Sequence, residues 1–97
     1  MKNQSMGGWE INPSMCPPEA VATGFNQVFE HMVGVKYKPL LYCGSQLVNG
    51  TNHMIIAEAT LVTNPPSNRI VKIVLHQTIP TEEHINGVFS ILKIEQV

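Results

Sequence analysis

The spacing of apolar residues predicts one amphipathic helix in the first third of the chain. Apolar side chains recur at intervals of four, three and four residues, which places them on one helix face: Val21, Phe25, Val28 and Met32. Pro18 and Glu19 suit the start of this helix, because proline is favoured in the first turn and an acidic side chain complements the helix dipole. We therefore expect a helix of about four turns that ends at Gly34 as its C-cap.

After Gly34 the pattern changes to the alternation of apolar and polar residues that is typical of strands. It predicts four long strands, and a short strand can precede the helix: residues 36–48, 51–63, 69–77 and 87–96, with 9–11 before them. Pro39 predicts a sheet edge or a β-bulge in the first long strand. One helix followed by strands with short connections predicts an α+β fold, in which a four- to five-stranded antiparallel sheet wraps the helix.

Small residues indicate where the helix and the sheet approach each other. Gly24 lies inside the predicted helix, where glycine costs about 1 kcal/mol relative to alanine. A close crossing of helix and sheet is one physical reason for a glycine there. Ala57 and Ala59 share the apolar face of one predicted strand and leave room for something bulky, such as the helix.

Composition limits the classes of protein to which this chain can belong. The chain has 97 residues, 43% of them hydrophobic and 13% charged, which suits a single compact domain. Its formal net charge is -1 and it has no run of Lys or Arg, so we expect neither nucleic acid nor membrane lipid as a partner. No apolar stretch approaches the roughly 20 residues that span a bilayer. No hydrophobic run follows Met1, which predicts a chain without a signal peptide or one whose signal has been removed.

Catalysis by this chain is not expected. Cys16 precedes a helix start, where a thiolate is stabilised, and four histidines are candidate bases: His31, His53, His76 and His84. A nucleophile needs a base within about 3 Å, however, and nothing in the spacing brings one to Cys16. The chain contains no aspartate to orient such a base, and no paired His or Cys spacing indicates a metal. We therefore predict no enzymatic activity, no cofactor and no metal, with the histidines on the surface or in strands.

A tight hairpin is predicted at Asn49-Gly50. This dipeptide favours a type I′ turn, in which both central residues have positive φ. Strand-like residues flank it at 40–43 and 54–57. The hairpin therefore connects the first two long strands.

The hairpin and three other segments resemble the cystatins, most closely the stefins, which inhibit papain-like cysteine proteases. Residues 46–50 read Gln-Leu-Val-Asn-Gly, similar to the Gln-x-Val-x-Gly of the first inhibitory hairpin. Three segments match in stefin order around it: Gly7-Gly8, the helix start Pro18-Glu19, and Gln77-Thr78-Ile79-Pro80 in place of Gln-Ser-Leu-Pro. The match covers nearly the whole chain. It departs at two positions, Trp9 and Asn49. At the position of Asn49 a small apolar residue is usual.

The resemblance implies a cystatin-like fold at residues 9–97, preceded at 1–8 by a flexible inhibitory trunk. In this family the trunk and two hairpins fill the protease cleft without a covalent bond. Met6 would enter a substrate pocket, a glycine would pass the catalytic cysteine, and Gln46 would brace the hairpin. The protease-binding residues implied are Met6, Gly7, Gly8, Gln46, Leu47, Val48, Asn49, Gly50, Ile79 and Pro80.

Further expectations follow from the same resemblance. Stefins lack disulfides, so Cys16 and Cys43 are expected to be free thiols in a reducing compartment. A glycan on the Asn49-Gly50-Thr51 sequon would obstruct the hairpin, which also favours the cytoplasm. The expected partners are cathepsin-type proteases, and the expected state is a monomer that can form a domain-swapped dimer. The alternative is a non-inhibitory binding or scaffold protein with the same fold, for which Asn49 is the main ground.

Overall fold

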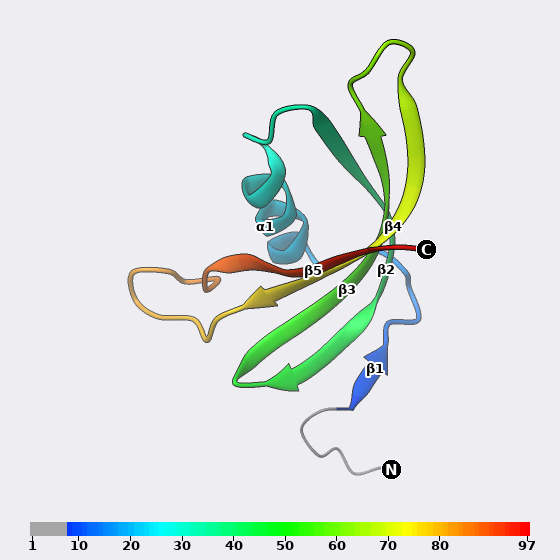
Figure 1. Ribbon diagram of the computed structural model, residues 1–97. Helices are drawn as coiled ribbons and strands as arrows, with labels where there is room; N and C mark the ends of the chain where they lie inside the picture. The colour runs from blue at the N-terminus through cyan, green and yellow to red at the C-terminus, as the bar shows by residue number, and fades with distance from the viewer. Residues whose placement is uncertain (1–7) are drawn as a thin grey trace.

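The computed structural model describes residues 8–97, which form one helix and one five-stranded antiparallel sheet (Figure 1). The strands lie in the sheet in chain order, and each pairs antiparallel with the next. The elements are β1 (Trp9–Ile11), α1 (Glu19–Phe29), β2 (Val35–Val48), β3 (Gly50–Leu61), β4 (Ser67–Gln77) and β5 (Phe89–Gln96). The predicted α+β class, with one helix packed on an antiparallel sheet, is confirmed.

The core lies between α1 and one face of the sheet. The helix buries Val21, Phe25 and Phe29, and the strands contribute Tyr42, Ile55, Ala57, Ala59, Val71, Ile73 and Leu75. Burying one large apolar side chain contributes about 1.5–3 kcal/mol. An isolated helix of 11 residues is marginal in water, so packing against the sheet, more than helix propensity, holds α1 in place.

The close approach predicted from the small residues is present. A Cβ atom on Gly24 would overlap the ring of Phe89 on β5, 2.6 Å from its Cε1 atom and closer still to Cδ1. Ala57 and Ala59 are buried in the same cluster as Phe25 and Phe29. Because the side chains of Gly24, Ala57 and Ala59 do not extend beyond Cβ, α1 can lie close to the sheet.

The helix is shorter than the sequence predicts. It ends at Phe29 with Glu30 as its C-cap, about one turn before Gly34. Met32 lies in the following turn, where its N–H donates to the Phe29 carbonyl at 3.2 Å, and is 38% exposed. Gly34, at φ +88°, turns the chain into β2 and accepts a hydrogen bond from the N–H of Val62. Residues 30–34 therefore reverse the chain, which the apolar spacing of Met32 does not reveal.

Strand β2 is irregular in the way that Pro39 predicts. Its register against β3 shifts between Pro39 and Leu41, and again between Tyr42 and Gly44. Within residues 8–97, β1 pairs with three residues of β2, Gly44 to Gln46, and no described strand covers the edge at Pro39. The predicted edge and bulge are both confirmed.

Candidate functional site

Three segments that are distant in the sequence meet at one end of the sheet. Trp9 of β1 pairs with Gln46 of β2, directly before the β2–β3 hairpin. On the other side of that hairpin, Thr51 of β3 pairs with Gln77, the last residue of β4. Gly8, the first hairpin and the connection 78–88 therefore follow one another across the sheet at the same end (Figure 1). We call this the hairpin end.

An apolar groove lies between the first hairpin and the 78–88 connection. Its volume is about 350 Å³, and its lining is neutral throughout: Leu47, Val48, Gly50, Thr51, Gln77, Thr78, Ile79 and Pro80. Leu47 is 65% exposed and Ile79 59% exposed, which is high for side chains of this size. The fold thus joins residues of the two motifs, about thirty positions apart in sequence, in one surface feature.

The structure places the other predicted site residues around this groove or outside the described chain. Asn49 is exposed at the tip of the hairpin and does not line the groove. Gly8 is exposed directly before β1. Met6 and Gly7 lie outside the described residues, as does the greater part of the expected trunk at 1–8.

The hairpin is in the predicted position, but its turn type differs. Val48 pairs directly with Gly50, which leaves Asn49 alone at the tip. Gly50 has φ +92°, whereas Met15 is the non-glycine residue with positive φ in the range 8–97. The predicted type I′ turn, with positive φ at both Asn49 and Gly50, is therefore wrong. Glycine adopts positive φ without steric cost, so Gly50 takes the unusual conformation that the reversal requires.

A row of polar side chains lies behind the hairpin on strands β2, β3 and β4. Asn52 Nδ2 donates to Gln46 Oε1 at 2.9 Å, and the same amide's Oδ1 lies 2.8 Å from Nδ1 of His76. Since Oδ1 can only accept, His76 Nδ1 is the donor. These contacts link Gln46 of β2 to Asn52 of β3 and His76 of β4 behind the hairpin.

A second polar chain, on the helix-facing side, joins the hairpin strands to the 78–88 connection. Tyr42 Oη lies 2.7 Å from His53 Nδ1, and His53 Nε2 lies 2.7 Å from Gln77 Oε1. Gln77 Nε2 donates to the carbonyl of Asn86 at 2.7 Å. His53 was expected on the surface or in a strand; it lies on strand β3, and there it is 5% exposed and central to this chain. Its alternation with Ile55 and Ala57 was the signal for an inward side chain.

The donors and acceptors in this chain define the charge state of His53. The Asn86 carbonyl only accepts, so the Gln77 amide nitrogen donates to it and Gln77 Oε1 must accept from His53 Nε2–H. A neutral imidazole then has an unprotonated Nδ1, which accepts from the hydroxyl of Tyr42. Burial lowers the pKa of His53, the hydrogen bond to Gln77 opposes this, and His76 lowers it further. Burial also raises the pKa of Tyr42, so both groups are neutral at physiological pH.

This arrangement predicts that the protein loses stability in acid. In the unfolded chain a histidine takes up its proton at a pKa of about 6.5, whereas folded His53 does so at a lower pH. Below about pH 6.5 the unfolded state therefore binds more protons, and the free energy of unfolding falls as the pH falls through the folded pKa. Urea unfolding at a series of pH values from 8 to 5 measures this. The slope should be smaller in His53→Gln, and a wild-type slope in that variant would contradict the assignment.

The 78–88 connection, which we call the second loop, is closed at its base by hydrogen bonds. Thr78 N–H donates to the Val88 carbonyl at 3.0 Å, and Val88 N–H donates to Thr78 Oγ1 at 2.8 Å. Near the tip, His84 N–H donates to Thr81 Oγ1 at 3.1 Å. The base is therefore ordered by its own contacts, and exposed Ile79 and Pro80 project beside the groove.

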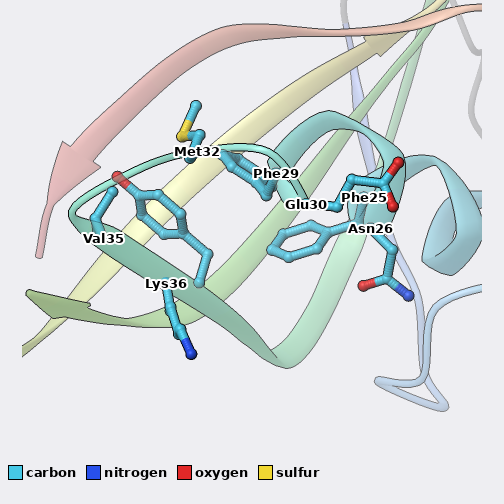
Figure 2. A pocket seen from close by; sticks show the side chains of 8 residues that line it. Phe25, Asn26, Phe29, Glu30, Met32, Val35 and Lys36 are labelled. Atoms are coloured by element: carbon cyan, nitrogen blue, oxygen red, sulfur yellow. The ribbon is translucent and has the colours of Figure 1, made fainter. Parts of the chain in front are cut away.

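A second hollow of about 450 Å³ lies at the opposite end of the sheet, between the end of α1 and the start of β2. Phe25 and Phe29 line it, with Met32, Val35 and the rim residues Asn26, Glu30 and Lys36 (Figure 2). Phe25 and Phe29 pack ring to ring with centroids 4.7 Å apart, and Phe29 packs on Tyr37 at 4.6 Å. None of the predicted site residues between Gly8 and Pro80 borders this hollow, which is the margin of the core.

Other candidate chemistry is scattered. Cys16 and Cys43 are free thiols, the first exposed and the second partly buried. Across residues 8–97 no three His, Cys, Asp or Glu side chains come together in a way that could hold a metal ion. Within the same range no helix is both long enough and apolar enough to cross a bilayer. Among the described residues of the two motifs, the features that remain for a binding site are the exposed Leu47 and Ile79 at the hairpin end.

Comparison with known proteins returned no match: no protein-family model, no curated protein and no solved structure matches this chain. The function must therefore be inferred from the residues and geometry of the hairpin end.

Proposed function

We propose that this chain is a cystatin-like, reversible and non-covalent inhibitor of papain-like cysteine proteases. One observation carries the proposal: Leu47, Val48 and Gly50 of the first motif line a single groove with Ile79 and Pro80 of the second. Gly8 lies at the same end of the sheet, beyond the pairing of Trp9 with Gln46. Trunk, first hairpin and second loop then act together on the protease cleft, in the order in which they cross the sheet.

The shape of the hairpin end suits inhibition without chemistry. Leu47 is exposed near the end of β2, where it pairs with Thr51, and Ile79 is exposed on the second loop, whose base is closed by the Thr78–Val88 hydrogen bonds. Rigid turns lose little conformational entropy on docking, so the burial of their apolar side chains is retained as affinity. No nucleophile is required, because the inhibitor fills the cleft and forms no bond with the catalytic cysteine.

The neutral lining of the groove indicates how a target is recognised. None of the eight lining residues carries a charge, and two of them, Leu47 and Ile79, are large exposed hydrophobics. Binding should therefore depend mainly on apolar contact and shape, and only weakly on salt, because charged contacts are the ones that salt screens. We infer cathepsin-type enzymes as the targets and a monomer as the inhibitory form.

Titration against papain tests the proposal. We expect competitive inhibition with a dissociation constant on the order of nanomolar, or about -12 kcal/mol, and no inhibition of trypsin, whose cleft is shaped differently. Leu47→Ala should weaken binding by about ten-fold or more, since burying a leucine contributes about 1.5–3 kcal/mol. Ile70→Ala is the matched control, because Ile70 is an exposed apolar residue on β4 that does not line the groove.

Two results would contradict the proposal. If no papain-like enzyme is inhibited at micromolar concentration, the chain is better explained as a non-inhibitory binding module of the same fold, consistent with the polar Asn49 at the exposed tip. If Leu47→Ala and Ile70→Ala weaken inhibition equally, the groove is not the contact surface.

A further inference from the structure

We propose that Trp9 is a further protease-contact residue, which extends the contact surface of the hairpin end from the groove to the opposite face of the sheet. This assignment rests on the proposed function. It goes beyond the cystatin motifs, because the resemblance departs at Trp9 and implies no role for this position.

Trp9 lies between two elements that the proposed function places on the enzyme. It directly follows the exposed Gly8 in the chain, and in the sheet it pairs with Gln46, the first residue of the first motif (Figure 1). Neighbouring strands are only about 4.8 Å apart. An enzyme that contacts both Gly8 and the first hairpin therefore passes directly beside Trp9.

The strand register assigns Trp9 to the face of the sheet away from the helix. Residues that pair directly share a face, and the row that begins at Trp9 continues through Gln46, Asn52 and His76. Hydrogen bonds between side chains join Asn52 to Gln46 and to His76 in this row. Side chains alternate along a strand, so Leu47 lies on the helix-facing side. Trp9 and Leu47 therefore project from opposite faces at the same end of the sheet.

Packing within the chain gives no reason for a tryptophan at this position. All three residues of β1 are exposed, and none belongs to the core cluster. Trp9 itself is 40% exposed, which is high for a side chain that is strongly buried on average. A large apolar side chain on the outside of a short edge strand is explained if a partner covers it.

The chemistry of Trp9 suits that role. Tryptophan is enriched among the few residues that dominate binding in protein interfaces, because one indole buries a large apolar area. Gln46 and His76 lie in the same row and supply polar groups beside it, as at the rim of an interface. Pairing with β2 holds the backbone of Trp9 in place, so docking costs mainly side-chain freedom.

Ile11 provides a matched control for an affinity measurement. It lies on the same strand and the same face, is 79% exposed, and pairs with Gly44, two residues farther from the hairpin. Trp9→Ala should weaken binding to papain by about 30-fold, mainly through faster dissociation, and Ile11→Ala by less than about five-fold. Equal weakening by the two variants would overturn the proposal, because a loss of β1 packing would then explain both.

The Asn12 amide shows whether β1 stays in place in these variants. Its N–H donates to the carbonyl of Cys43 at 3.0 Å, so it should remain protected against hydrogen exchange while β1 lies on β2. Retained protection in Trp9→Ala would assign the loss of affinity to the missing indole. If that protection is lost, a direct measurement of contact decides.

Fluorine NMR provides this direct measurement. Trp9 is the only tryptophan of the chain, so 5-fluorotryptophan labels this one side chain. On addition of unlabelled papain, we expect the signal to shift and its dependence on light or heavy water to be largely lost, because contact excludes water from the indole. A complex in which both quantities keep their free-protein values would overturn the role of Trp9 and leave the proposed function standing. If no papain-like enzyme binds the wild type, both proposals fail.

Discussion

Replacing Gly50 with alanine is expected to lower the free energy of unfolding by about 3 kcal/mol, the sum of two unfavourable effects. The first is conformational, because Gly50 has φ +92°, a value that residues with a Cβ rarely adopt. The second is steric, because a Cβ there would overlap the main-chain oxygen of Gln77 and lie 3.0 Å from Cε1 of His76. Thermal unfolding should show a loss of roughly 15 °C for a domain of this size.

Gly34→Ala separates the two effects. Gly34 has a similar φ of +88°, but no atom lies within 4 Å of the position that its Cβ would occupy. The Gly34→Ala variant should therefore lose only the conformational contribution, about 1–2 kcal/mol of unfolding free energy. The difference between the two variants therefore measures how tightly the hairpin packs on β4. Equal losses would mean that β4 moves aside at no cost, and the groove would then not be a fixed surface.

Replacing Gly24 with alanine should destabilise the protein, although the same change stabilises most helices. Alanine is favoured over glycine in a helix interior by about 1 kcal/mol. Here the added methyl group would overlap the ring of Phe89, and overpacking of a core typically costs about 1–3 kcal/mol. Because three ring atoms are involved, we expect a net loss of about 2 kcal/mol. Urea unfolding of the variant and of wild type measures this.

A double-mutant cycle tests the cause of that loss. In a Phe89→Leu background the ring is absent, so adding Gly24→Ala should cost far less than in wild type, with an interaction energy of about 1 kcal/mol or more. Thr23→Ala, on the exposed side of α1, should change stability by less than about 0.5 kcal/mol. A Gly24→Ala variant more stable than wild type would show that α1 can move away from β5.

The sheet could be predicted from sequence because its signals are local. Alternating residues such as Ile55, Ala57 and Ala59 mark a buried strand face without knowledge of the partner strand. Asn49-Gly50 marks a chain reversal for a similar reason, since few residues tolerate the backbone of a tight turn. Where a prediction needed only neighbours along the chain, it agreed with the structure to within a few residues.

Predictions failed where the outcome depends on distant partners. Met32 continues the apolar spacing of α1, yet the chain must turn before it so that Val35 can pair with Leu61. The turn type at Asn49 depends on how β2 and β3 are matched, and two bulges in β2 alter that register. Tertiary pairing decides both cases, and local propensity is only a weak guide to it.

The same distinction between local signals and distant contacts applies to the candidate site. Its exposed residues lie in two recognisable motifs, so sequence identified the walls of the groove. The polar chain behind it was missed, because Tyr42 and Gln77 lie 11 and 24 positions from His53 and meet it only after the strands are in register. The alternation of His53 with Ile55 and Ala57 could have indicated an inward side chain, but the prediction placed it only on the surface or in a strand, and no local pattern indicates what it contacts.

The open edge of β2 bears on the solubility of this protein. β1 covers β2 only at Gly44 to Gln46, so within residues 8–97 no strand pairs with the outer side of β2 before that point. An uncovered strand edge is a template on which a second chain can extend the sheet, the first step in aggregation. Here the edge carries exposed Lys36 and Lys38, and Pro39, which has no N–H to donate, stands at a bulge. If a second copy of this strand paired here, its lysines would repel Lys36 and Lys38, and the row of hydrogen-bond donors would be interrupted at Pro39. Both effects oppose growth of the sheet at the end away from the groove.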